Sequence, residues 1–289
     1  MVTGKGGVGK SAMAAALGKV LAETRRVLVL EMDPRENVHQ LFGAPPSDGD
    51  FVDLGDRLYL QNLKPGEVLD QLVVERLRFG AVARRVLESP IYRRFVEGAP
   101  GLEELAILGH ALRVVRGLAR KAPAVDTVIL DAPATGHGLS LLAAPFLVSE
   151  VIRSGPIAEM NREVRDWLAD PDRVGVLAVT LAEEMPVTES LELADELRRR
   201  LGRAPEVLAV NGLYPEVDRA DEVLTDELPL WELRRRVNDA ELARLRADWT
   251  GPWVEIPLLP IERGPRLCRA LAELLSEGLT EVLPGEVEP

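Results

Sequence analysis

The stretch Gly4-Lys5-Gly6-Gly7-Val8-Gly9-Lys10-Ser11 fits the pattern G-x-x-x-x-G-K-[ST], in which glycines allow successive backbone N–H groups to surround a phosphate chain. In this pattern Lys10 reaches the β- and γ-phosphates, and the Ser11 hydroxyl completes a Mg²⁺ site. Residues Ala12–Glu23 are predicted to form a helix whose positive N-terminal end faces the anion. The alternative is a glycine-rich turn with a purely structural role. Eight fitting positions followed by a helix favour the phosphate-binding loop, and we include Ala12 in the expected binding set.

The chain of 289 residues is acidic, with a formal charge of −12 and a hydrophobic content of 46%. This length and this hydrophobic content suffice for one large α/β domain with an insertion. Proteins that bind nucleic acid normally present a basic face, so the acidity argues against nucleic acid as a partner. It argues more weakly against an anionic membrane surface as the main partner.

The sequence contains a single cysteine, Cys268, which excludes an intrachain disulfide and an intrachain C-x-x-C metal site. On a helix beside Leu267 and Leu271 it is expected to pack in the core. A reducing, cytoplasmic setting is the default for such a chain. We find no signal peptide and no run of about 18 apolar residues. The prediction is therefore a soluble, cytoplasmic protein without a stable membrane anchor.

The sequence before the glycine-rich stretch is short. Only Met1, Val2 and Thr3 precede Gly4, whereas a strand in the centre of a sheet usually has about five or six residues. We therefore expect a short first strand that leaves a central position of the sheet partly filled, and a native start upstream of Met1.

An apolar run, Arg26–Glu31, predicts a buried parallel strand. Asp33 follows it and therefore lies at the carboxyl end of a strand, where α/β folds place their chemistry. The alternative is that Asp33 caps a short helix ending at Phe42, with Pro34 at the first helical position. The two interpretations are compatible.

A second strand, Asp126–Asp131, also ends in an aspartate, and a loop rather than a helix follows it. In P-loop proteins an aspartate at the end of an apolar strand is the usual second anchor of the Mg²⁺ site. The alternative is that Asp131 merely caps a turn. The preceding P-loop favours the role at the metal.

Two segments have the apolar periodicity of helices, residues 65–121 and residues 139–168. The first is far longer than a simple crossover between strands, so we expect the two to form a helical subdomain inserted in the core. Its apolar helices at 101–118 and 139–152 either line a groove for a client or pack on each other.

The remaining elements alternate between strands and helices. Strands are predicted at 58–63, 174–180, 206–211 and 253–256, helices at 184–201, 228–248 and 264–278, and a loop at 45–56. This order indicates an α/β fold, with a doubly wound, mostly parallel sheet that carries the P-loop and the inserted helical subdomain. Residues 1–289 are expected to form a single P-loop domain.

Several separated segments together resemble the ArsA-like ATPases, within the P-loop superfamily that also contains MinD, ParA and the nitrogenase iron protein. They are Lys5–Ser11, Asp33-Pro34…Asn37, Asp131…Thr135-Gly136-His137, Asn211 and Pro257-Leu258-Leu259…Arg263-Gly264. The family includes the arsenite-pump ATPase and the tail-anchored-protein targeting factor. The resemblance covers nearly the whole chain, and this order of motifs is more specific than a P-loop alone.

The resemblance implies roles at the phosphates. Asp33 would position or activate the attacking water and reach Mg²⁺ through a water molecule. Asn37 would lie in the same switch and face a dimer interface. Asp131 would hold Mg²⁺ through water, and residues 135–137 would sense the γ-phosphate in a second switch.

The resemblance also implies how the base and the subunits are arranged. Asn211 would read adenine, with Pro257 and Leu258 beside the base. Lys5 would reach across a homodimer to the partner's nucleotide, and together with Lys10 and Mg²⁺ it would offset the charge on the transferring phosphoryl group. The alternative for Lys5 is that it points to solvent.

Some residues depart from the family pattern. Ala12 stands where many relatives have a second hydroxyl, and Glu36 and Gln40 replace the histidine and aspartate usual in the first switch of the targeting factors. The single cysteine provides neither a zinc-joining pair nor a triad for arsenite. It also excludes a nitrogenase-type iron–sulfur dimer, because each subunit would need two thiolates.

The implied function is that of a Mg²⁺-dependent ATPase that binds ATP and ADP and works as a homodimer, with a hydrophobic protein client as a possible partner. One alternative is a MinD/ParA-type positioning ATPase, which would need a basic surface for DNA or a basic amphipathic helix for membrane. Another is a nucleotide-binding interaction module with little turnover. His39, His110 and His137 are far apart in the sequence, so a histidine metal site is not expected.

Overall fold

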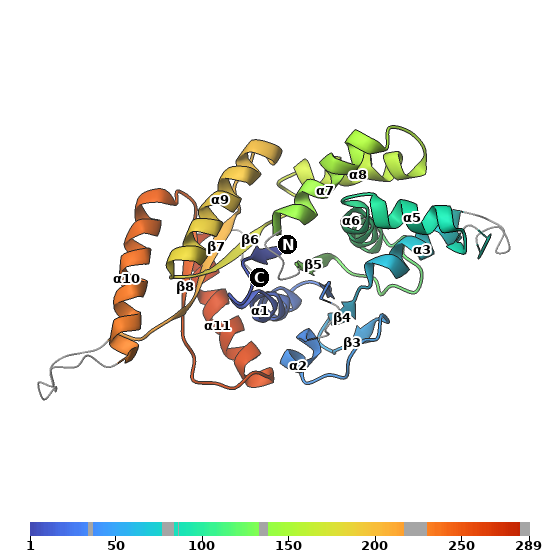
Figure 1. The fold of residues 1–289 in the computed structure, drawn as a ribbon. Helices are drawn as coiled ribbons and strands as arrows, with labels where there is room; N and C mark the ends of the chain where they lie inside the picture. The colour runs from blue at the N-terminus through green and yellow to red at the C-terminus, as the bar shows by residue number, and fades with distance from the viewer. Residues whose placement is uncertain (34–36, 77–83, 86, 133–137, 217–229, 284–289) are drawn as a thin grey trace, which may run out of the picture.

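The computed structural model describes residues 1–33, 37–76, 84–85, 87–132, 138–216 and 230–283. Its centre is an eight-stranded sheet with the order β3-β4-β2-β5-β1-β6-β7-β8 (Figure 1). All neighbouring strands are parallel except β3 and β4. The α/β class and the mostly parallel sheet are therefore confirmed.

The strands lie where the apolar runs predicted them. They are β1 (Val2–Gly4), β2 (Val27–Glu31), β4 (Leu58–Asn62), β5 (Thr127–Asp131), β6 (Leu177–Leu181), β7 (Val207–Leu213) and β8 (Trp253–Pro257). β1 has three residues although it lies between β5 and β6, as expected for the short first strand.

The prediction of an unbroken loop over residues 45–56 is wrong at β3 (Val52–Asp53). This two-residue strand pairs antiparallel with β4 at the edge of the sheet. The turn between them passes through Gly55, Asp56 and Arg57, which all have positive φ. A strand this short contributes almost no periodic signal to the surrounding Gly-, Pro- and Asp-rich sequence.

One face of the sheet is covered by α1 (Lys10–Ala22), α2 (Val38–Phe42) and α11 (Pro265–Val282), which lie together in the lower half of Figure 1. Cys268 of α11 is buried in this core, as predicted. α11 continues past its expected end near Gly278. A side chain there would approach Val254 of β8 to within 2.8 Å, so this glycine allows the helix to continue close to the sheet.

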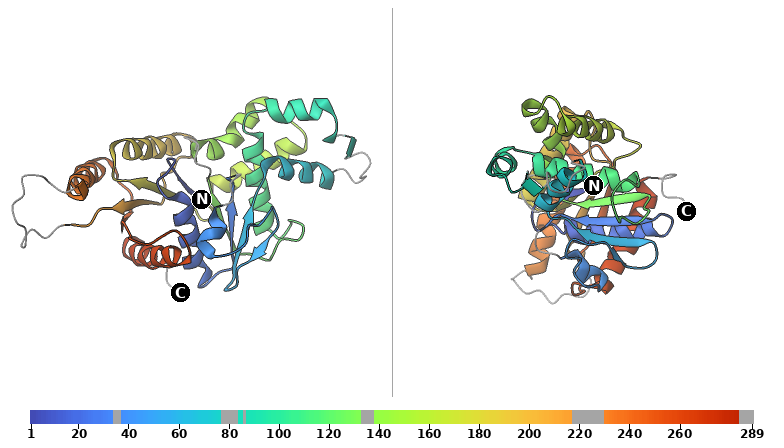
Figure 2. Two further views of the ribbon diagram at one scale, coloured as in Figure 1. Left: turned by 60° about the horizontal axis from the view of Figure 1, so that its bottom comes forward. Right: turned by 90° about the vertical axis from the view of Figure 1, so that its right-hand side faces the viewer.

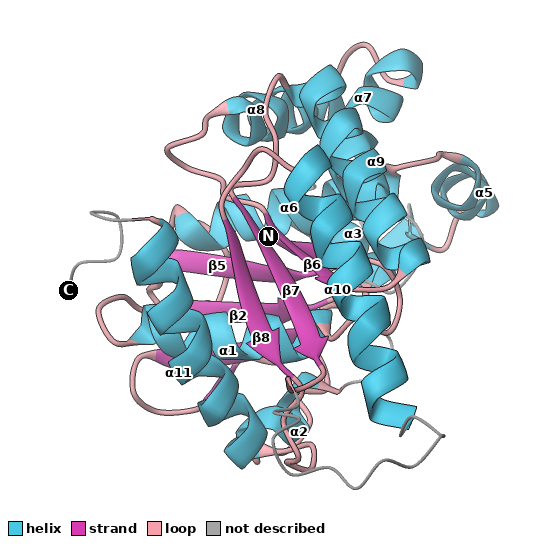
Figure 3. Cartoon of the chain, turned by 90° about the vertical axis from the view of Figure 1, so that its left-hand side faces the viewer, coloured by secondary structure: helices cyan, strands magenta, loops and turns pink. Residues whose placement is uncertain are grey.

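The other face is covered by the helical segments between β4 and β6 and by α9 and α10 (Figures 2 and 3). These helices are α3 (Pro65–Arg76), α5 (Pro90–Gly98), α6 (Leu102–Val115), α7 (Gly138–Val151), α8 (Pro156–Ala169), α9 (Glu184–Leu201) and α10 (Leu230–Asp248). α6 and α7 pack on each other in one apolar cluster. Of the two interpretations of these helices, mutual packing is the arrangement in this structure.

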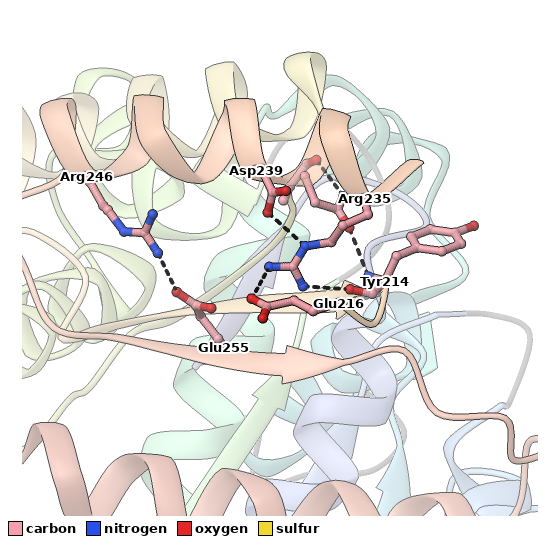
Figure 4. Close-up of polar contacts among 8 residues, drawn as sticks. Tyr214, Glu216, Arg235, Asp239, Arg246 and Glu255 are labelled. Carbon is pink, nitrogen blue, oxygen red and sulfur yellow. Dashed lines mark hydrogen bonds and ion pairs between the residues drawn. The ribbon is translucent and has the colours of Figure 1, made fainter. Parts of the chain in front are cut away.

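Polar contacts join α10 to the residues that follow β7 and to β8 (Figure 4). The Arg235 guanidinium donates to the Tyr214 carbonyl oxygen at 2.8 Å and pairs with Glu216 at 2.9 Å. Arg246 of the same helix pairs with Glu255 of β8 at 3.5 Å. Such exposed pairs contribute little each, and the apolar contacts beneath them hold the helix to the sheet.

No helix in the described part of the chain is both long enough and apolar enough to cross a bilayer.

Candidate nucleotide site

The glycine-rich loop connects β1 to α1, and two of its glycines are required by close contacts. At Gly4, with φ 145°, a Cβ would lie 2.1 Å from the Val179 carbonyl oxygen of β6. At Gly9, the N-cap of α1 with φ 96°, a Cβ would lie 2.4 Å from Nδ2 of Asn211. Both positions combine a backbone conformation that L-residues rarely adopt with no space for a side chain.

A cavity of about 320 Å³ opens at the N-terminus of α1. Its lining comes from four parts of the chain: Gly7, Gly9, Lys10, Ser11, Ala12, Asp33, Leu41, Asp131, Ala132, Arg263 and Leu267. The fold thus brings together at one cavity the P-loop and both strand-end aspartates that the sequence indicated. The start of a helix beside such a cavity favours an anion.

Lys10 is buried at the start of α1. Its Nζ donates a hydrogen bond to the Lys5 carbonyl oxygen at 2.7 Å, so the side chain folds back over the loop. Burial lowers the pKa of Lys10, while the carboxylates of Asp131 and Asp33 oppose this shift. An ammonium group held inside a loop of backbone N–H groups is suited to bind phosphate oxygens.

Asp131 is the last residue of β5 and is buried at the base of the cavity. Burial raises the pKa of Asp131 to about 6, although the Ser11 hydroxyl and the Lys10 ammonium lower it. Its Oδ1 is buried without a hydrogen-bond partner in the described structure. A hydroxyl beside a carboxylate with an unpaired oxygen fits Mg²⁺, which usually binds one or two protein oxygens together with phosphate and water.

Asp33 follows β2 and lines the same cavity. Its interpretation as the cap of the next helix is wrong, because α2 begins at Val38 with Asn37 as its N-cap. The Asp33 backbone instead bonds to the sheet: Nδ2 of Asn62 on β4 donates to the Asp33 carbonyl oxygen at 2.7 Å. Asp33 thus lies at the cavity and does not cap α2.

The residues expected to contact adenine lie at or near the ends of β7 and β8. Nδ2 of Asn211, on β7, donates to the Val8 carbonyl oxygen at 2.9 Å. Pro257 ends β8, and the Leu258 backbone N–H donates to the Leu213 carbonyl oxygen at 2.7 Å. Asn211 thus touches the P-loop directly, whereas Pro257 and Leu258 lie outside the phosphate cavity lining. Their role at adenine stays a prediction.

Lys5 has a partner within its own chain. Its Nζ lies 3.0 Å from Oε1 of Glu189 on α9, and both side chains are about one third exposed (31% and 35%). The sequence predicted Lys5 either in solvent or at a partner subunit's phosphates, and it did not predict the pair with Glu189.

Sequence patterns did not assign roles to two further charged residues. Arg263, in the loop before α11, lines the cavity and donates from Nη2 to the Asn37 carbonyl oxygen at 3.1 Å. Glu31, the last residue of β2, is buried, and burial raises its pKa to about 7 even though backbone N–H groups donate to it. A glutamate at the end of an otherwise apolar strand is the one visible signal for Glu31.

Several expected residues lie outside the described structure. They are Pro34 and Glu36 of the first switch and Thr135, Gly136 and His137 of the second. Within the described residues, no group of three or more His, Cys, Asp or Glu side chains has an arrangement that could hold a metal ion.

Comparison with known proteins places this site in a family. The sequence model of the anion-transporting ATPases of the ArsA type matches residues 1–156. ATPase BagA of Mycobacterium tuberculosis is 30% identical over 210 residues, which cover 68% of this chain and 60% of that protein. An arsenical pump-driving ATPase of Escherichia coli is 28% identical over 269 residues, covering 86% of this chain and 44% of that protein. ATPase get3 of Pyrenophora tritici-repentis is 23% identical over 293 residues, covering 97% and 80%.

The match to the mycobacterial proteins thus spans about 60% of their length. The family model covers more than half of this chain and includes the P-loop, Asp33 and Asp131. The chain belongs to the ArsA-like ATPase family.

Proposed function

We propose that this chain is a Mg²⁺-dependent ATP hydrolase that acts at the P-loop cavity. The observation that carries the proposal is the convergence of Lys10, Ser11, Asp33 and Asp131 on one cavity at the N-terminus of α1. Phosphoryl transfer to water depends mainly on positioning and on offsetting charge. One ammonium, one hydroxyl and two carboxylates supply both functions, and membership in an ATPase family supports the same conclusion.

Each of these residues has a distinct role in the proposal. Lys10 stabilises the negative charge on the β- and γ-phosphates. Ser11 would hold Mg²⁺ directly and Asp131 would hold it through water. Asp33 would orient the attacking water and reach the metal through a second water molecule. When bound, Mg²⁺ would supply positive charge that offsets the charge developing on the transferring phosphoryl group.

The base would lie on the Asn211 side of the loop. Asn211 contacts the P-loop, and β8 ends at Pro257 beside it in the sheet, so the adenine would follow the carboxyl edge towards Leu258. This arrangement supports ATP and ADP as the nucleotides.

We further propose a cytoplasmic homodimer whose subunits change arrangement with nucleotide state. γ-Phosphate contacts commonly hold such switch loops and release them on hydrolysis. A hydrophobic protein is the proposed client. Because α6 and α7 bury their apolar faces against each other, a client groove between them would require these helices to separate.

The test compares wild type with Lys10→Ala. ATP with Mg²⁺ should raise the thermal unfolding midpoint of wild type and leave that of Lys10→Ala unchanged, and single-turnover assays should detect phosphate release from wild type alone. No thermal shift in wild type would refute nucleotide binding. A shift without phosphate release would identify a nucleotide-dependent interaction module instead of an enzyme.

A further inference from the structure

Three side chains that end neighbouring strands form a row beside the phosphate cavity. Glu31 of β2 is in register with Asn62 of β4 on one side and with Asp131 of β5 on the other. Residues in register on parallel strands present their side chains on the same face of a sheet. All three are buried, but only Asp131 lines the cavity. Glu31 and Asn62 are therefore buried beside the cavity, on β2 and β4, without lining it.

Glu31 contacts the segment that follows Asp33. Its Oε1 accepts hydrogen bonds from the backbone N–H of Asn37 at 2.6 Å and from that of Val38 at 3.1 Å. These groups belong to the N-cap and first residue of α2, whose N-cap side chain makes no capping hydrogen bond. A carboxylate from the sheet thus satisfies donors that a helix N-terminus leaves unpaired.

Asn62 contacts the other end of the same segment. Its Nδ2 donates to the carbonyl oxygen of Asp33 at 2.7 Å, and Asn62 lies in register beside Glu31. Two adjacent buried side chains therefore fix the backbone on both sides of residues 34–36, at Asp33 and at Asn37.

A structural cap alone does not explain a glutamate at this position. Burying a carboxylate is costly unless it is paired and hydrogen-bonded, and Glu31 lies beside a second carboxylate, Asp131, rather than a cation. Its Oε2 is buried without a hydrogen-bond partner in the described part of the chain. The N-cap of α2 is already an asparagine, a residue type whose own side chain could cap the helix without this cost.

We propose that Glu31 is a positioning residue that sets the place of the Asp33 carboxylate by holding the Asn37–Val38 backbone, with Asn62 as its partner. Glu31 does not line the phosphate cavity and acts through Asp33. The inference rests on the proposed function, since it assigns Asp33 to the attacking water. A misplacement of about 1 Å in such a group can reduce a rate by as much as about 10²-fold.

The first test measures single-turnover ATP hydrolysis and ATP affinity separately. Glu31→Ala removes both accepted hydrogen bonds and should reduce the rate roughly 10- to 10²-fold, while ATP affinity stays within about threefold because the P-loop is untouched. Glu31→Gln keeps one carbonyl oxygen as acceptor and should restore most of the rate. Glu255→Ala removes an exposed glutamate from β8, away from the cavity, and should leave the rate unchanged.

The second test asks whether Glu31 acts through Asp33. In an Asp33→Asn background, Glu31→Ala should cause no further loss, because the residue that it positions is already disabled. Should Glu31→Ala fail to fold, Asn62→Ala takes its place with the same expectations. An unchanged rate in a folded single variant, or a full additional loss in the Asp33→Asn background, would overturn the inference. Wild type without any hydrolysis would instead refute the proposed function.

Discussion

The phosphate cavity has two walls that are built in different ways. One wall is the P-loop, a continuous stretch between β1 and α1 whose shape depends on its backbone, on Gly4 and Gly9, and on the start of a helix. The opposite wall is collected from distant parts of the chain. Asp33 comes from the end of β2, Asp131 from the end of β5, and Arg263 from the loop before α11.

The difference separates two functions. Backbone N–H groups and Lys10 can hold the phosphates however the opposite wall is arranged, so the P-loop wall determines affinity. The opposite wall contains both carboxylates, and side chains such as Glu31, Asn62 and Arg263 hold its first segment in place. We therefore expect changes in the opposite wall, apart from those at the metal-holding Asp131, to affect turnover more than binding.

The largest expected effect is that of Asp33→Asn. If Asp33 orients the attacking water, this variant should lose hydrolysis by roughly 10²–10⁴-fold, the range for a positioned acid–base group. Its affinity for ATP with Mg²⁺ should remain near that of wild type. Single-turnover assays together with nucleotide titration check both parts. Equal losses of affinity and turnover would show that the two walls do not divide these functions.

The cavity-lining residues and the contacts that support them differ in how well the sequence predicted them. The P-loop motif, the apolar runs and the aspartates that follow them placed Lys10, Ser11, Asp33 and Asp131 correctly at one cavity. The parallel order of strands brings their carboxyl ends to one edge, so separate strand-end signals become neighbours.

The supporting contacts were not predictable in the same way. Asn62 ends its strand without any motif, and its contact with Asp33 depends on the register between β2 and β4. Glu189 lies in the middle of an amphipathic helix, and its position beside Lys5 depends on how α9 packs near the P-loop. Register and helix packing are tertiary properties that local periodicity does not encode.

The next expected effect concerns Lys5, a P-loop residue that does not line the cavity. An exposed ion pair such as Lys5–Glu189 contributes little stability, so a partner's phosphates could replace Glu189 when ATP binds. Mixing Lys5→Ala subunits with Asp33→Asn subunits should then restore one working site per mixed dimer, with Asp33 from the first subunit and Lys5 from the second.

The readout is ATP turnover of proven mixed dimers compared with each parent variant. Glu189→Gln serves as a control that releases Lys5 without removing it, and it should retain turnover. Mixed dimers that stay inactive, or a Lys5→Ala parent with normal turnover, would rule out a role for Lys5 across the interface.

The smallest expected effect compares two aspartates at opposite ends of β5. Burial raises the pKa of Asp131 to about 6 from an ordinary value of 3.8, so the folded state binds more protons than the unfolded state between these values. Its ionisation therefore costs stability as the pH rises from about 4 to about 6, and the cost is fully present above that range.

Asp126 is exposed, and its hydrogen bond with Arg26 lowers its pKa to about 2. Its stabilising contribution is present above about pH 4 and is lost as the pH falls towards about 2.

The two substitutions should consequently have opposite signs without nucleotide. At pH 7 Asp131→Asn should raise the unfolding midpoint by a few degrees, because it removes the cost of ionising the buried carboxyl, which is on the order of 2 kcal/mol. This gain should vanish below about pH 4. Asp126→Asn should lower the midpoint slightly, because its pair with Arg26 is exposed.

With ATP and Mg²⁺ the order of the two midpoints should reverse, since Asp131→Asn loses a group that holds the metal while Asp126→Asn keeps the whole site. Thermal unfolding of both variants across pH, with and without ATP and Mg²⁺, makes the comparison. If Asp131→Asn destabilises the nucleotide-free protein at pH 7, the Asp131 carboxylate stabilises the fold, and its burial is not a cost to the nucleotide-free protein.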